Sequence, residues 1–361
     1  MHITDGKIGA REQLAVATFL IAMKVSDTTP DILIHHAMNA AWLVSLINGL
    51  VVLIPLLLIL HLLKRYQTGL YDLLLTLTGR WGSTLIMLFI FLWLFISTFV
   101  NSRSYIDIVN TLFFPQTSIE ALYVLFLLFC ALVSIRGFET LGRMSWLLFW
   151  LIAGIVILLL LTTWQHMKIS QLFPLLGPGL DVILLRGVTH SSLYVELFLI
   201  AFFFPYTTSY KALRDGVWIG FAVSALMLIV FNAVYVMVFD YPAIASMPYP
   251  YQQLTRSSSL FGMEAHMDAL FLGVWIIAAI LHFALYLYIL AYLFARLFKI
   301  QEFEMLIIPM TGLVLYIGMI QENVMQMIFL RDVLMMTTSI FYLLLPFGLW
   351  ILHLWRRRKV R

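Results

Sequence analysis

The stretch Lys24-Val25-Ser26-Asp27-Thr28-Thr29-Pro30 interrupts an otherwise apolar run over residues 13–38. A membrane-spanning helix needs about 20 apolar residues, and this run is long enough to cross. Within it, however, stand a lysine, an aspartate and a proline, which lacks the backbone donor that a helix uses. We therefore predict a spanning helix that is broken near residues 24–30, with unpaired N–H and C=O groups at the break.

The rest of the chain is equally apolar, which excludes a soluble globule. Of its 361 residues, 63% are hydrophobic and 11% are charged, whereas soluble domains are about 45–50% apolar and about 25% charged. We predict an all-α polytopic membrane protein with about ten transmembrane helices. The longest connecting segment, Asp240–His266, is too short for a second domain, so residues 1–361 form one membrane domain. The ten apolar runs are 13–38, 42–63, 82–109, 119–135, 145–164, 188–206, 217–239, 268–295, 305–320 and 333–355.

The distribution of Lys and Arg predicts the orientation, because cytoplasmic loops carry an excess of these residues. With a cytoplasmic N-terminus, sixteen of the 22 basic residues lie in inner segments. The C-terminus is then cytoplasmic too, and its basic tail faces the lipid headgroups. Because the basic residues lie between apolar runs, we expect no nucleic-acid partner. The four basic residues of the outer segments are Lys168, Arg186, Arg256 and Arg331.

A second break echoes the first one. The sixth run carries Phe204-Pro205-Tyr206-Thr207-Thr208 near its end, five spans after the break in the first run. A repeat of five spans is inverted in the membrane, and a pair of interrupted helices marks the substrate site of such folds. We predict two inverted five-helix repeats, about 10–164 and 188–355. Alternatively, Pro205 simply ends its helix.

Five ionisable side chains fall within the spans, where each costs at least ~2.5–3.5 kcal/mol. Arg103 and Asp107 are four residues apart and form a structural ion pair on one helix face. Lys24 and Asp27 are three residues apart, and Glu196 lies in the middle of the sixth run. One interpretation is that Lys24 and Glu196 form a buried ion pair between helices one and six. The other is that they belong to a ligand site.

An amino-acid site fits the second interpretation. A zwitterion needs donors for its carboxylate and acceptors for its ammonium, and unwound backbone supplies both. We therefore expect a small-molecule site formed by Lys24, Ser26, Asp27, Thr28 and Glu196.

Other polar residues are interpreted as structural. His35 and His36 lie at the outer end of the first run and are expected to be an interface pair rather than a metal site. His282 is expected to form a hydrogen bond across a close helix contact, and Gly216 and Gly220 have the spacing of close helix packing. The chain has no P-loop, nucleophile elbow or HExxH motif, so we expect no enzyme, no metal and no cofactor.

Several passages resemble a known family, the B subunit of spore germinant receptors. These are the GerAB/YndE-type spore germination permeases of the amino acid–polyamine–organocation (APC) superfamily. The chain differs at the first break, where many superfamily members carry glycines and this chain has Lys-Val-Ser-Asp. The similar passages are Ile8–Leu14, Asn39–Leu43, Gly137–Arg143, Phe173-Pro174 with Gly179, Glu196 with Pro205, and Phe261–Phe271 running on to Trp275.

The resemblance implies a LeuT/APC-like fold and a nutrient-sensing subunit in the inner membrane of a bacterial spore. It also implies binding of a germinant, such as an L-amino acid, and assembly with an A subunit and a lipoprotein C subunit. Binding would shift the fold between two states for which the ligand has different affinities. Lys24 then either changes how the ligand binds or fills a cation site. The alternatives are a proton-coupled amino-acid permease and an assembly scaffold with a vestigial pocket.

Overall fold

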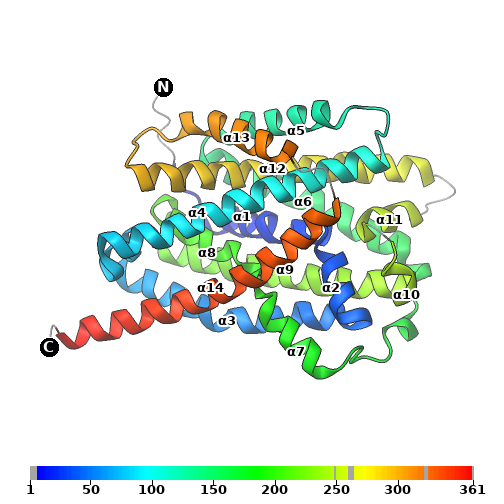
Figure 1. Ribbon diagram of the computed structural model, residues 1–361, viewed down its shortest axis with the longest axis horizontal. Coiled ribbons are helices and arrows are strands. Elements are labelled where there is room, and N and C mark those ends of the chain that lie inside the picture. Colours follow the sequence, from blue (N-terminus) through cyan, green and yellow to red (C-terminus); the bar gives the residue numbers. More distant parts are fainter. Residues whose placement is uncertain (1–5, 248, 259–263, 321–323, 360–361) are drawn as a thin grey trace.

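The computed structural model describes residues 6–247, 249–258, 264–320 and 324–359. Within these ranges the chain is helical and forms no sheet, and one isolated bridge pairs Ile8 with Thr207. The long helices run along the longest axis of the molecule (Figure 1). Residues 261–263, the start of the passage Phe261–Phe271 that resembles the germinant receptor family, lie outside the described residues.

Fourteen α-helices and seven 3₁₀ helices follow one another along the described chain. The α-helices are α1 (Ala10–Ala22), α2 (Thr29–Ala37), α3 (Ala41–Tyr66), α4 (Leu70–Leu112), α5 (Ile119–Ser134), α6 (Phe138–Thr163), α7 (Leu180–Thr189), α8 (Glu196–Ile200), α9 (Tyr210–Phe239), α10 (Tyr241–Ile244), α11 (Pro250–Ser257), α12 (Glu264–Phe298), α13 (Ile307–Ile320) and α14 (Val324–Lys359). The 3₁₀ helices are η1 (Met23–Val25), η2 (Met38–Ala40), η3 (Trp164–His166), η4 (Ile169–Leu172), η5 (Ser191–Tyr194), η6 (Ala201–Tyr206) and η7 (Glu304–Leu306).

The prediction of an all-α polytopic membrane protein is confirmed. Six described helices are long and apolar enough to cross a membrane, and a bent pair adds a seventh candidate. Two shorter apolar helices, Ile119–Ser134 and Glu304–Ile320, coincide with two further predicted runs. Helix α1 begins and α14 ends toward the same end of the bundle (Figure 1), as an even number of crossings requires. The division into two inverted repeats stays a prediction.

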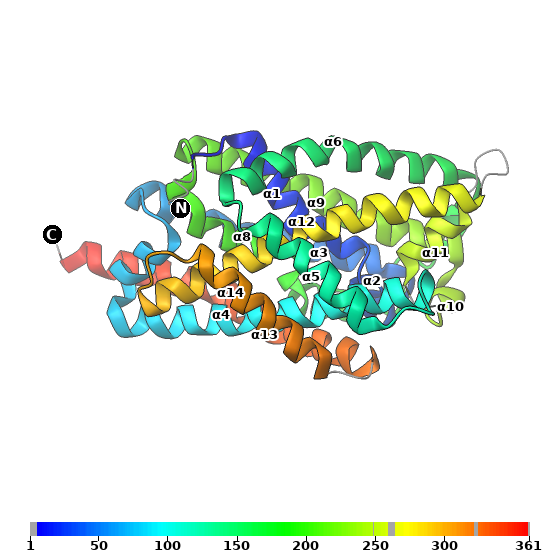
Figure 2. The same cartoon turned by 90° about the horizontal axis from the view of Figure 1, so that it is seen from above.

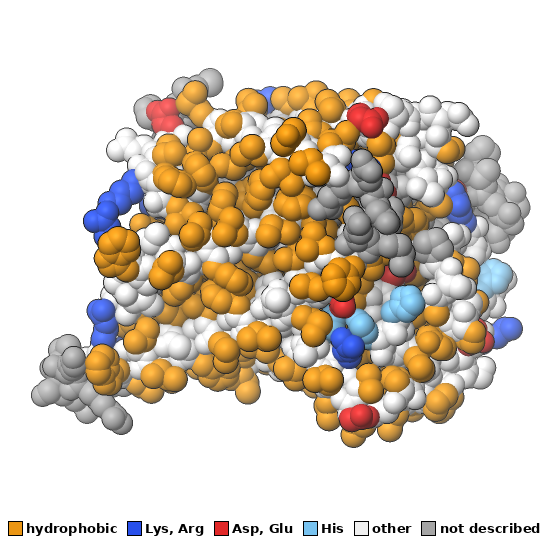
Figure 3. Space-filling view, in the orientation of Figure 1, with side chains coloured by type: hydrophobic (Ala, Val, Ile, Leu, Met, Phe, Trp, Pro, Cys, Tyr) orange, Lys and Arg blue, Asp and Glu red, His pale blue; other side chains and the backbone are white. Residues whose placement is uncertain are grey.

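The surface of the bundle suits a lipid environment. In Figure 3, hydrophobic side chains spread over the middle of the visible face, and most Lys and Arg side chains lie toward its two ends. Leu147, Leu161 and Leu226 are each more than 60% exposed. Such exposure would be costly in water and is expected against acyl chains.

The first break lies where the sequence predicts it. Helix α1 ends at Ala22, the turn η1 follows, and α2 begins at Thr29. Pro30 stands in the first turn of α2, where a helix does not need the missing N–H. The proline therefore starts the second half of the broken span.

The second break lies elsewhere than predicted. The chain bends by 45° between Leu180–Thr189 and Ser191–Tyr206, which puts the break at His190 rather than at residues 204–208. Pro205 lies in η6, at the end of this span. There it removes only a terminal backbone donor, so the alternative interpretation, that Pro205 ends its helix, is correct. The span also begins at Leu180, before the predicted residue 188.

Helix α1 packs closely against α9, as the glycine spacing predicts. An added Cβ at Gly216 would lie 2.6 Å from the Cβ of Gln13, and one at Gly220 would lie 2.5 Å from the Cβ of Ala17. Helix α12 crosses α1 as well, where His282 Nδ1 lies 2.8 Å from the carbonyl oxygen of Phe19. The first half of the broken span is thus held from two sides. Figure 2 shows α1 beside α9 and α12, with α5 and α13 on the flank of α12.

We expect Gly220→Leu to destabilise the protein, because the added side chain would meet Ala17 and force α1 away from α9. Overpacking of this kind costs about 1–3 kcal/mol. Thermal unfolding in detergent, followed by tryptophan fluorescence, measures the loss. Gly154→Leu is the matched control, because an added Cβ at Gly154 meets nothing within 4 Å. Equal melting temperatures for the two variants would contradict this packing.

Candidate ligand site at the two helix breaks

The Lys24 ammonium links the two breaks. Its Nζ donates hydrogen bonds to Glu196 Oε2 at 2.7 Å and to the carbonyl oxygens of Leu193 and Ser192 at 2.6 and 3.3 Å. An ammonium has three donors, so all three are in use. The first broken span thus supplies a cation to the carbonyl groups of the second.

Glu196 completes this arrangement from the first turn of α8. Its side chain is 1% exposed, and Tyr286 of α12 donates its hydroxyl proton to Oε1 at 2.6 Å. Both carboxylate oxygens therefore have a partner. Such a pair holds three helices together, and the free energy of burying two charges is offset only while all of these partners remain.

A second buried ion pair joins the first break to α14. Arg331 Nη2 contacts the Asp27 carboxylate and donates to Thr29 Oγ1 at 2.7 Å, and Nη1 donates to Thr28 Oγ1 at 2.8 Å. Asp27 Oδ1 also accepts the backbone N–H of Thr29 at 2.7 Å. Asp27 therefore accepts a backbone donor at the start of α2, and one arginine from the last helix neutralises its charge.

Three carbonyl groups of the first break accept hydrogen bonds from side chains of neighbouring helices. Tyr105 of α4 donates to the carbonyl oxygen of Met23 at 2.9 Å, and Tyr235 of α9 donates to that of Val25 at 2.8 Å. Gln252 of α11 donates to the Ser26 carbonyl oxygen at 3.1 Å, and Trp275 of α12 donates to the side-chain oxygen of Ser26 at 2.9 Å. These three carbonyl groups are thus paired in this structure, as burial in a low-dielectric medium requires.

A polar cavity of about 40 Å³ lies between the two ion pairs. This volume holds a few water molecules but is too small for an amino acid, so the site is closed. The polar residues that line the cavity are Lys24, Thr29, Ser97, Asn101, Ser192, Glu196, Tyr286 and Arg331.

A larger cavity of about 330 Å³ lies on the other side of the first break. Its lining includes Met23, Ser26 and Trp275, but also Ile157 and Leu226, which face outward from the bundle. The lining is nearly all apolar and contains no charged residue. It therefore lacks the groups that a zwitterion needs.

The five residues expected to bind a ligand are all buried at the first break or next to the second. In the present state they contact one another or neighbouring helices. The other predicted pair, Arg103 and Asp107, lies on α4 with Nε 3.2 Å from Oδ1 and does not line the polar cavity.

The assignment of Arg331 to an outer segment is wrong. The residue lies inside α14 and is 5% exposed. The tenth span was placed at residue 333, although the apolar residues Met327–Leu330 lie just before Arg331 and Asp332. Two adjacent charges with apolar residues on both sides were the signal that this position is buried. Without Arg331, three basic residues remain in the predicted outer segments.

Comparisons with known proteins agree with this architecture. The profile of a family described as spore germination protein matches residues 13–327. YfkT of Bacillus subtilis (strain 168), a protein named for spore germination, is 30% identical over 164 residues. That alignment covers 44% of this chain and 44% of YfkT, so the chain spans less than half the length of this curated relative.

Among solved structures, the manganese transporter of Eremococcus coleocola is similar in fold. A mutant form and a complex with an aromatic bis-isothiourea substituted compound each superpose with a TM-score of 0.57 at 12% identity. Each match covers 94% of this chain and 76% of the transporter. At this identity the likeness concerns the fold alone.

We expect the Lys24–Glu196 pair to show strong coupling in a double-mutant cycle. Lys24→Met or Glu196→Gln alone leaves one buried group without its charged partner and costs about 3–5 kcal/mol. The double variant removes both charges, so it should be more stable than the sum of the two single losses predicts. Thermal unfolding of the four proteins in detergent measures the coupling. Purely additive losses would show that the pair does not interact.

Proposed function

The chain belongs to the spore germination protein family, and we propose that it is a membrane-embedded nutrient sensor. In this proposal a small germinant, such as an L-amino acid, binds between the two helix breaks. The observation that carries it is one small cavity lined by Lys24, Glu196 and Arg331, which belong to the ion pairs Lys24–Glu196 and Asp27–Arg331. The cavity wall thus carries two cations and one anion, and a second anion, Asp27, is paired with Arg331, so the site offers partners for both charges of a zwitterion.

Binding in this proposal exchanges ion pairs. The carboxylate of the ligand takes the place of Asp27 at Arg331 or of Glu196 at Lys24, and its ammonium pairs with the released carboxylate. Because the site is closed, α12 or α14 has to move before the ligand enters. A ligand with higher affinity for the opened arrangement shifts the population toward it, and this shift is the signal.

We further propose the cellular setting that the family resemblance implies. The protein lies in the inner membrane of the spore with both termini in the cytoplasm, and acts with an A subunit and a lipoprotein C subunit rather than as an enzyme. The family match and the strong bias of Lys and Arg toward inner segments support this setting.

The second candidate function is a proton-coupled amino-acid permease, and the position of Lys24 favours it. Its ammonium sits on two break carbonyls and a carboxylate, which are the ligands that a metal cation from solution would use. A built-in cation removes the need for sodium and leaves protonation of this lysine or of Glu196 as the coupling step.

We expect at least one of the 20 common L-amino acids to raise the melting temperature of the purified protein in detergent. A ligand at 100 times its Kd stabilises the folded state by about 2.7 kcal/mol. Glu196→Gln should abolish this shift because it removes a charge that lines the cavity, and Asp27→Asn should abolish it because it removes the partner of Arg331, which also lines the cavity. The matched control is Arg103→Gln with Asp107→Asn, a buried pair that does not line the polar cavity.

Two outcomes contradict the ligand site: no amino acid shifts the wild-type protein, or the Asp27 and Glu196 variants respond like the control. Uptake of the responding, radiolabelled amino acid into proteoliposomes with a pH gradient separates the two candidate functions. Accumulation by the protein alone supports the permease. Binding without accumulation supports the sensor.

A further inference from the structure

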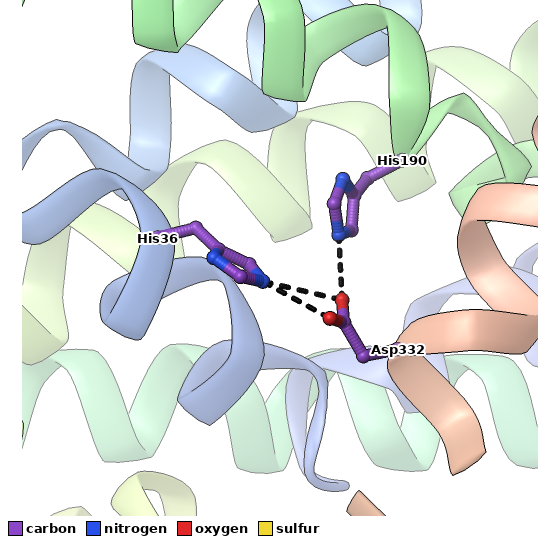
Figure 4. A group of neighbouring side chains, drawn as sticks. All are labelled: His36, His190 and Asp332. Atoms are coloured by element: carbon purple, nitrogen blue, oxygen red, sulfur yellow. Dashed lines mark hydrogen bonds and ion pairs between the residues drawn. The ribbon is translucent and has the colours of Figure 1, made fainter. Parts of the chain in front are cut away.

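A second polar cluster lies next to the second break and does not belong to the ligand site. Figure 4 shows its members: His36 from α2, His190 at the bend between α7 and η5, and Asp332 from α14. His36 Nε2 lies 3.2 Å from both carboxylate oxygens of Asp332, and His190 Nε2 lies 2.8 Å from Oδ1. One ligand atom from each residue lies within 4.8 Å of the other two.

The hydrogen bonds of His190 determine what its Nε2 presents to Asp332. The hydroxyl of Thr189 has one proton, which it donates to the carbonyl oxygen of Leu185 at 2.9 Å. Thr189 Oγ1 also lies 3.0 Å from His190 Nδ1, so it accepts the proton of Nδ1. A neutral imidazole with its proton on Nδ1 has a lone pair on Nε2. That lone pair faces a carboxylate, an arrangement that a shared cation stabilises.

The separation of each histidine from Asp332 fits a shared metal ion. Zinc binds imidazole nitrogen and carboxylate oxygen at about 2.0–2.2 Å, so neighbouring ligand atoms in tetrahedral or octahedral sites lie about 3.0–3.5 Å apart. The observed separations from Asp332 are 2.8 and 3.2 Å. The Thr189 hydroxyl that orients His190 is the kind of outer-shell partner that metal-binding histidines have.

Burial and charge also suit a bound cation. The His190 side chain is 0% exposed, whereas those of His36 and Asp332 are 24% and 22% exposed, which leaves one side for entry and for a water ligand. In the part of the chain that the structure describes, the Asp332 carboxylate faces the two imidazoles at 2.8 and 3.2 Å. The neighbouring Arg331 is engaged by Asp27, Thr28 and Thr29. A cation at the cluster would therefore supply charge that this carboxylate lacks.

We propose that His36, His190 and Asp332 bind a divalent transition-metal ion of the zinc class, which ties α2, the second break and α14 together. This contrasts with the sequence-based expectation of an interface pair at His35 and His36. The ion would hold the ligand site closed, because two of its three ligands lie next to residues of that site along the chain. Asp332 follows Arg331, and His190 precedes the carbonyl groups that accept from Lys24.

The test uses the full-length protein, purified in detergent through a tag without histidine and stripped with a chelator. We expect the wild type to bind one more equivalent of Zn²⁺ than His36→Ala or Asp332→Asn, by elemental analysis after dialysis. Isothermal titration should show an affinity loss of at least about tenfold in each variant. His35→Ala is the matched control, because His35 is exposed and belongs to the same helix.

A second measurement covers variants that fold poorly. Zn²⁺ should raise the melting temperature of the wild type and of His35→Ala, but not of His36→Ala, and Mg²⁺ should raise none of them. Equal Zn²⁺ content in the wild type and in His36→Ala would overturn the proposal. The proposal would also be overturned if the melting temperature of the wild type changed with pH, and changed less in His36→Ala, but did not respond to Zn²⁺. Neither readout uses the germinant, so failure here is distinct from failure of the proposed function.

Discussion

Every backbone N–H and C=O group inside a membrane needs a partner, and this requirement governs the centre of the protein. A continuous helix meets it alone, but two of the spans are broken. At the second break, the Lys24 ammonium contacts two carbonyl oxygens. At the first, two tyrosine side chains and one glutamine side chain from α4, α9 and α11 take the same role. The breaks thus dictate which polar residues the surrounding apolar helices carry.

The sequence predicts features that depend on local composition. The all-α membrane fold follows from apolar runs, and the first break follows from two charges and a proline within one such run. The second break depends on distant residues instead, because the carbonyl groups around it are held by Lys24, 168 and 169 residues earlier in the chain. Nothing local distinguishes His190 as a bend, whereas Pro205 is a strong local signal that marks only a helix end.

The same distinction applies to the site. Lys24, Asp27 and Glu196 are recognisable from sequence because a charge inside an apolar run is costly and usually has a partner or a function. Which charges form pairs depends on the tertiary structure. Lys24 and Asp27 have the spacing of neighbours on one helix, yet the helix is broken between them and they pair with Glu196 and Arg331 respectively. The arginine was placed in a loop because the run was started two residues after it, and its role appears only when α14 crosses the first break.

Two consecutive residues of α14 reach the two breaks: Arg331 contacts the first break, and Asp332 lies beside the second. From Arg331 the helix runs on for 28 residues to Lys359, about 40 Å at 1.5 Å per residue, to the end of the bundle where α1 begins (Figure 1). A rod anchored at one end converts a small tilt there into a larger sweep at the other. The last turns of α14 are therefore where a change at the breaks has its greatest amplitude.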